Sequence, residues 1–181
     1  MIEKDEVLLK INDEWRKFSK PHCIISATRV SDVLKALQEV DHLVEKNNWH
    51  ATGFVSYEAA PAFDNALRVL EPDGFPLLWF GLYSEPHAVK SSDVFADLKT
   101  LDKINWKATV KQENYTAAIK KKKKQISYGN TYQVNFTMRL NSNFNDQAWD
   151  LFLNLIQNQN KYAAYVNTGR FTICSASPEL F

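Results

Sequence analysis

The chain alternates between stretches in which apolar residues recur at helical spacing and shorter stretches with the composition of strands. Apolar residues three or four positions apart predict helices within 31–47, 112–127 and 145–156. Short apolar and β-branched runs predict strands at 6–10, 23–28, 49–57, 76–83, 104–110, 161–167 and 170–175. Many of these strands are close in sequence, so we expect antiparallel or mixed sheets with helices outside, the α+β fold class.

Residues at the ends of the predicted elements define their limits. Ser31 is the expected N-cap of the first helix, and Asn47-Asn48 is its expected end. Gly129 has the position of a C′ glycine after the second helix, and Thr168-Gly169 suits a hairpin turn. Gly53 lies inside a predicted strand and indicates close backbone approach. The first helix is expected to bury a stripe of Val33, Leu37, Val40 and Val44, widened by Leu34 and Leu43.

The stretch from Tyr128 to Arg139 follows the second helix, and from Thr131 onward it is predicted to be a strand with two unlike faces. Alternate residues of a strand point to opposite sides. One side here is apolar, and the other carries uncharged hydrogen-bonding groups ending in an arginine: Thr131, Gln133, Asn135, Thr137 and Arg139. Such a row suits a polar cavity, although the pattern alone favours an ordinary half-exposed strand.

Composition narrows the class of protein. With 181 residues, 45% of them hydrophobic, the chain can form a packed core of one domain or of one domain and a part. A net charge of +1 gives no general electrostatic case for nucleic acid. Cys23 and Cys174 are far apart and fit a reduced, cytosolic protein. Neither a signal core nor a membrane span is visible, so a cytoplasmic location is expected.

Two features carry candidate chemistry. Lys120 to Lys124 form a lysine run that could dock an acidic partner, although a solvated helix face is the more common meaning of such a run. Glu179 lies between Pro178 and Leu180, where an apolar setting would raise its pKa and suit a general acid. An edge glutamate paired with a basic residue remains the alternative.

Three separated motifs carry a resemblance to a known family. Gly53–Asp64, Ile126–Asn135 and Ser175–Phe181 occur in an order and at separations that resemble the chorismate-utilising enzymes, most closely the component I branch of the aminodeoxychorismate (para-aminobenzoate) synthases. The resemblance implies part of a two-part α/β sandwich of large antiparallel sheets with helices outside. It also implies an N-terminal α+β domain at 1–110 and an incomplete, opening part of the chorismate-binding catalytic domain at 111–181.

The resemblance implies that the C4 hydroxyl of chorismate is replaced by an amino group. A glutamine amidotransferase partner would supply the ammonia, Mg2+ would hold the substrate carboxylate, and the product would lead to para-aminobenzoate and folate. By motif, Glu179 would assist loss of the hydroxyl, and Gln133 stands where water-using relatives carry a lysine. The Mg2+ ligands are expected beyond Phe181 and none in this chain, so the chain alone is expected to be inactive.

One departure and two alternatives accompany this interpretation. Asn130 stands where the family usually has aspartate. Anthranilate synthase component I would share Gln133 and Glu179 by motif. A non-catalytic docking or scaffold module, meeting its partner through the lysine run, is the alternative from another class.

Overall fold

The computed structural model describes residues 2–157 and 161–177. The chain divides into two compact units by its internal contacts. The first unit combines the residues up to 100 with those from 147 onward, and the second is Leu101–Asp146. The first unit therefore joins segments from both ends of the sequence.

Five strands of the described residues form the larger sheet of the first unit, in the order β10-β9-β1-β2-β6. All neighbouring strands in it are antiparallel. Asn12 and Asp13 join the first two strands, and both have positive φ, as a two-residue hairpin turn of type I′ requires. The strands are β1 (Glu6–Ile11), β2 (Glu14–Phe18), β6 (His87–Val89), β9 (Tyr162–Asn167) and β10 (Thr172–Ser177).

The smaller sheet of the first unit has the order β3-β5-β4 among the described strands and is also antiparallel. It consists of β3 (Cys23–Ala27), β4 (His50–Val55) and β5 (Leu78–Tyr83). Helix α1 (Val30–Asn47) covers one side of it and buries residues at helical spacing, Val33, Ala36 and Val40. A short 3-10 helix, η1 (Tyr57–Ala62), follows β4 and adds Ala59 to the same core.

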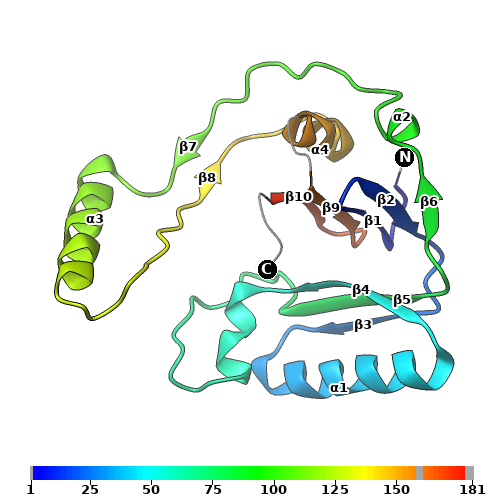
Figure 1. Cartoon of the computed structure of the whole chain (residues 1–181), viewed down its shortest axis with the longest axis horizontal. Helices are drawn as coiled ribbons and strands as arrows, with labels where there is room; N and C mark the ends of the chain where they lie inside the picture. Colours follow the sequence, from blue (N-terminus) through cyan, green and yellow to red (C-terminus); the bar gives the residue numbers. More distant parts are fainter. Residues whose placement is uncertain (1, 158–160, 178–181) are drawn as a thin grey trace. The chain divides into compact units, whose positions relative to one another are not determined.

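The two sheets of the first unit pack face to face, and helices cover their outer sides (Figure 1). Alternation within β1 shows the layering. Val7 packs toward Trp79 and Tyr83 of the smaller sheet, whereas Leu8 packs with α4 (Ala148–Ile156) on the opposite side. The layers are therefore α1, the smaller sheet, the larger sheet and α4, with α2 (Ser91–Val94) contributing to the last core.

The second unit is built on a single long helix, α3 (Gln112–Ser127). Its end is a Schellman motif: the Gly129 N–H donates to the Ile126 carbonyl and the Asn130 N–H donates to the Gln125 carbonyl. A short ladder pairs β7 (Lys107–Ala108) with β8 (Leu140–Asn141). The structure describes every residue of 101–146, and none of them is buried.

Most predicted elements are confirmed. The fold class is α+β with antiparallel sheets and outer helices, as expected. The second helix has the predicted limits, Gln112–Ser127, and Asn48 ends α1 in the left-handed conformation. The hairpin at Thr168-Gly169 joins β9 and β10. The predicted domain boundary between residues 110 and 111 stays a prediction.

Two local predictions in and near the first helix were wrong. The N-cap is Arg29, and Ser31 lies inside α1, because the helix begins at Val30 without a side-chain cap. Arg29 instead pairs with Asp32 at 2.7 Å. Leu34 is 46% exposed, because the buried stripe of α1 widens on its opposite side, at Ala36. Strand β2 was not among the predicted strands.

The predicted strand at 131–139 is absent, and the predicted strand at 104–110 is reduced to two residues. Only Lys107–Ala108 and Leu140–Asn141 form a ladder there. The physical reason is that alternation defines two faces but provides no hydrogen-bonding partner, and a strand exists only within a ladder. In the described part of the chain, residues 131–139 have no paired strand beside them.

Candidate functional site

The polar row around Gln133 lies on an exposed stretch of the second unit. The Thr131 hydroxyl donates to the Gln133 carbonyl at 2.9 Å, and the Gln133 side-chain amide lies 3.4 Å from the Asn135 side-chain oxygen. These contacts order the backbone locally. Gln133 itself is exposed, so within its unit it faces solvent and lines no enclosed cavity.

Phe136 attaches this stretch to α3. Its ring meets the Tyr115 ring edge-to-face, with 5.2 Å between centroids. The Lys122 ammonium lies 4.6 Å from the Phe136 centroid and donates a 2.9 Å hydrogen bond to the Asn135 carbonyl. Tyr132, which was predicted to share the apolar face with Phe136, is 92% exposed. Phe136 therefore packs against α3, whereas Tyr132 on the same face is exposed to solvent.

Glu179 lies outside the described residues. The Ser175–Ser177 segment that leads to it forms the end of β10, where Ser175 pairs with Ala164 of β9. Gln133 belongs to the second unit and β10 to the first. Whether the two candidate residues share one site therefore stays a prediction, as do their chemical roles.

The magnesium expectation is likewise untested. Among residues 2–157 and 161–177, no group of three or more His, Cys, Asp or Glu side chains is arranged to hold a metal ion. The described residues therefore do not fit a complete Mg2+ site by themselves.

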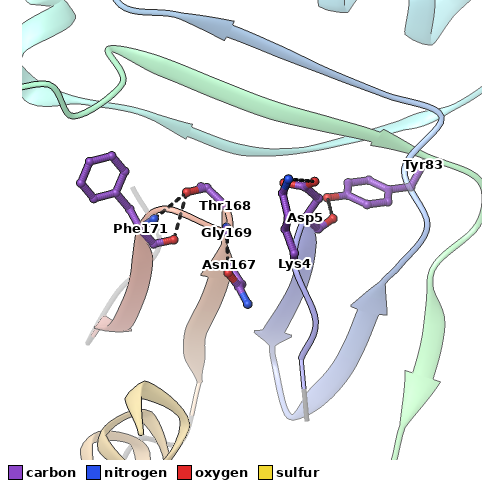
Figure 2. Close-up of polar contacts among 7 residues, drawn as sticks. All are labelled: Lys4, Asp5, Tyr83, Asn167, Thr168, Gly169 and Phe171. Carbon is purple, nitrogen blue, oxygen red and sulfur yellow. Dashed lines mark hydrogen bonds and ion pairs between the residues drawn. The ribbon is translucent and has the colours of Figure 1, made fainter. Parts of the chain in front are cut away.

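A set of polar contacts links three distant segments of the first unit (Figure 2). The Tyr83 hydroxyl, on the last residue of β5, donates to the Asp5 carbonyl at 2.9 Å. The Asp5 N–H donates to the Asn167 carbonyl at 2.7 Å, and Lys4 pairs with the Asp5 carboxylate at 3.8 Å. Burial raises the pKa of Tyr83 well above its ordinary range, so its hydroxyl keeps the proton it donates.

The turn of the β9–β10 hairpin lies beside this linkage and is closed by its own residues (Figure 2). The Asn167 side-chain oxygen accepts the Gly169 N–H at 2.9 Å. The Thr168 hydroxyl donates to the Phe171 carbonyl and accepts the Phe171 N–H, each at 3.0 Å. Gly169 has φ +81°, and an added Cβ there would meet the Lys4 side chain. These groups are structural, because each is engaged within the turn.

A buried ion pair was also missed by the sequence prediction. The Lys17 ammonium lies 2.8 Å from the Glu6 carboxylate, which also accepts the Glu3 N–H at 2.8 Å. Glu6 is buried, so Lys17 compensates a charge that would otherwise be costly inside the protein. The available signal was the Asn12-Asp13 turn, which predicts a hairpin and would have placed β2, and with it Lys17, beside β1.

The first motif of the resemblance forms the end of β4 and η1. Gly53 is required there, because an added Cβ would collide with the Trp79 carbonyl oxygen of β5, which confirms the close approach. Ser56 follows the strand, and its hydroxyl is buried without a hydrogen-bond partner among the described residues. Tyr57 beside it is 80% exposed.

Comparison with known proteins finds similarity over the C-terminal part of this chain. Residues 99–181 match the family model described as chorismate binding enzyme. Anthranilate synthase component 1 of Lactococcus lactis subsp. lactis (strain IL1403) is 27% identical over 84 residues, which is 46% of this chain and 18% of that relative. The chain thus spans less than a fifth of the length of the relative it matches.

The family match covers less than half of the chain, and the antiparallel α+β fold is compatible with it. Two of the three motifs, Ile126–Asn135 and Ser175–Phe181, lie inside the matched residues. Gly53–Asp64 lies outside them. The matches do not distinguish the aminodeoxychorismate branch from the anthranilate branch. No helix in the described part of the chain is both long and apolar enough to cross a membrane.

Proposed function

We propose that this chain is part of an enzyme that aminates chorismate with ammonia. The observation that carries the proposal is the family match over residues 99–181, which contains the second and third motifs. The exposed position of Gln133 is compatible with a site completed by further parts of an enzyme.

The chemistry follows from the two candidate residues. A new bond joins the ammonia nitrogen to the ring, the bond from C4 to the hydroxyl breaks, and the hydroxyl leaves as water. Glu179 supplies the proton that this poor leaving group needs. Gln133 carries an amide, which donates and accepts hydrogen bonds but takes no proton near neutral pH. An amide orients ammonia, which is already nucleophilic, and does not activate water.

In its finer form, the proposal is component I of an aminodeoxychorismate synthase that serves para-aminobenzoate and folate synthesis. Asn135-Phe136-Thr137 and Ser56–Asp64 support this branch by motif. A glutamine amidotransferase subunit would then deliver ammonia. Mg2+ would neutralise the substrate carboxylate, bound by residues outside those described.

Anthranilate synthase component I is the second candidate. The similarity to the Lactococcus lactis protein favours it as strongly as the motifs favour the first. The two activities differ in product, because anthranilate has lost the pyruvyl group of chorismate and aminodeoxychorismate retains it.

The test uses the 181-residue chain with chorismate, Mg2+ and ammonium, alone and mixed with the remaining C-terminal part of a curated relative's catalytic region. We expect no turnover by the chain alone and an ammonium-dependent amine from the mixture, identified by mass. A product with the pyruvyl group supports the aminodeoxychorismate branch, and anthranilate supports the second candidate. A hydroxylated product, or no product from a mixture that binds chorismate, contradicts the proposal.

A further inference from the structure

Positive charge is concentrated in the second unit. Residues 101–146 contain nine lysines and arginines but three aspartates and glutamates, a net charge of +6. The rest of the chain contains thirteen basic and eighteen acidic residues, a net charge of −5. The net charge of +1 for the whole chain therefore conceals two oppositely charged parts.

The five lysines of α3 are not equivalent. Successive residues of an α-helix are about 100° apart, so Lys122 lies on the side of the apolar stripe and the other four share the opposite arc. Lys122 is half-buried and is engaged by the Phe136 ring and the Asn135 carbonyl. The remaining four, which we call the outer lysine face, are exposed: Lys120, Lys121, Lys123 and Lys124.

The outer lysine face has no compensating charge in its surroundings. In the described part of the chain, no carboxylate lies within ion-pair distance of its four ammonium groups. Glu113, in the first turn, is the acidic residue of the helix. Lys120 and Lys124 are four positions apart, and like charges at that spacing destabilise a helix. A bound anionic group would relieve this repulsion.

We propose that the outer lysine face docks a protein partner that presents a cluster of carboxylates. Four ammonium groups lie within little more than one helical turn, which matches a few neighbouring carboxylates. The whole chain has a net charge of only +1, which gives no long-range attraction for an extended nucleic acid. A membrane surface would require several large apolar side chains on the same face, whereas a single ring, that of Tyr128, lies against Lys124 there in the described part of the chain. The proposal does not depend on the chorismate reaction.

The test measures binding of fluorescent poly-L-glutamate to the full chain at low and physiological salt. The variant K120Q/K121Q/K123Q/K124Q removes the outer lysine face while keeping good helix formers. The matched control, K20Q/K35Q/K46Q/K99Q, removes the same charge from exposed positions of the first unit. We expect affinity to fall about tenfold in the first variant, as four weak charge pairs predict, and less than twofold in the control.

Duplex DNA and phosphatidylserine vesicles are measured in parallel, and circular dichroism checks that α3 keeps its helix. Equal losses in the two variants would show that net charge alone is responsible and would overturn the proposal. Tighter binding to DNA or vesicles than to poly-L-glutamate would also overturn it, as would undetectable binding at low salt. Restored affinity in the arginine variant K120R/K121R/K123R/K124R would support it.

Discussion

The Tyr83 hydroxyl donates a hydrogen bond to the carbonyl of Asp5, 78 residues earlier in the chain. Tyr83 ends β5 of the smaller sheet, and Asp5 immediately precedes β1 of the larger sheet. The tyrosine is 1% exposed and its ring packs edge-to-face on Phe18, with 5.7 Å between centroids. Tyr83 therefore packs its ring in the apolar layer between the two sheets and binds the Asp5 backbone through its hydroxyl.

Replacing Tyr83 with phenylalanine should keep the ring packing and lose the hydrogen bond. The Asp5 carbonyl would lose this partner, so we expect a loss of about 1–2 kcal/mol in the free energy of unfolding. For a chain of this size, that corresponds to a fall in Tm of roughly 3–6 °C. Thermal unfolding followed by circular dichroism measures it.

Tyr115→Phe is the matched control, because that tyrosine is exposed and contributes its ring to the contact with Phe136. It should leave Tm within about a degree, as surface substitutions usually do. Equal Tm values for Tyr83→Phe and Tyr115→Phe would show that the hydrogen bond to Asp5 does not stabilise the packed sheets.

Alanine at Gly53 should be among the most destabilising small substitutions in the first unit. The new Cβ would meet the Trp79 carbonyl oxygen, and backbone on a paired strand cannot move aside without breaking the ladder. We expect a loss of about 3 kcal/mol or more in denaturant unfolding.

Gly129→Ala is the comparison. An added Cβ at Gly129 meets nothing within 4 Å, but the residue has φ +74°. The expected loss is about 1 kcal/mol, from backbone strain alone. Similar losses at Gly53 and Gly129 would mean that the smaller sheet adjusts more readily than its register indicates.

The elements that the sequence predicted well are those whose signal is local. Helix α3 was predicted with its limits because Gly129 closes it through the Schellman motif. The hairpin of β9 and β10 was predicted because Thr168-Gly169 is a turn sequence and the strands are adjacent. Gly53 was correctly assigned to a close approach, although its partner Trp79 was not visible in the pattern.

Apart from β2, which follows a local turn, the features that the sequence prediction missed depend on distant segments. Strand β1 pairs with β9, some 150 residues away, and no local pattern contains that partnership. The link from Tyr83 to Asp5 is of the same kind. Residues 131–139 show the converse, because their alternation is strong but no strand beside them is present in the described residues. The candidate site includes residues 131–139. The sequence therefore showed the motif around Gln133 but not the backbone conformation of that stretch.

The half-buried thiol of Cys174 should make the protein less stable in alkali. Burial raises its pKa from 9.0 to about 11. Below pH 9 both states hold the proton, and between pH 9 and about 11 the unfolded chain loses it while the native state does not. Deprotonation lowers the free energy of the unfolded state relative to that of the native state. The free energy of unfolding therefore falls as the pH rises through this window.

Cys174→Ser removes the titrating thiol and can still donate to the Ala148 carbonyl, which Cys174 contacts at 3.5 Å. Urea unfolding at several pH values should show a shallower decline above pH 9 in the variant. Tyr83 and Tyr165, whose pKa values burial also raises, would continue the decline above pH 10. Between pH 6 and 8 the two proteins should differ by a constant amount, and identical slopes above pH 9 would contradict the assignment to Cys174.

Lys122→Gln should release the stretch of 131–139 from α3. The substitution removes the cation–π contact with Phe136 and the charged donor to the Asn135 carbonyl. We expect chymotrypsin to cleave after Phe136 about fivefold faster, since the two contacts together are worth on the order of 1 kcal/mol. Lys121→Gln is the matched control, because Lys121 is on the outer lysine face, and it should leave the rate unchanged.

Gln133→Lys tests the role that the motif assigns to this position within the proposed function. A lysine amine can accept a proton from water, whereas the glutamine amide cannot. Because Gln133 is exposed in its unit, the substitution should leave the fold intact, with an unchanged Tm as the check. In the reconstituted assay, amination should fall at least about tenfold and a hydroxylated product should appear, both read by mass. Gln125→Lys on α3 is the control for an added charge and should aminate normally. Unchanged amination in Gln133→Lys would remove Gln133 from the proposed choice between ammonia and water.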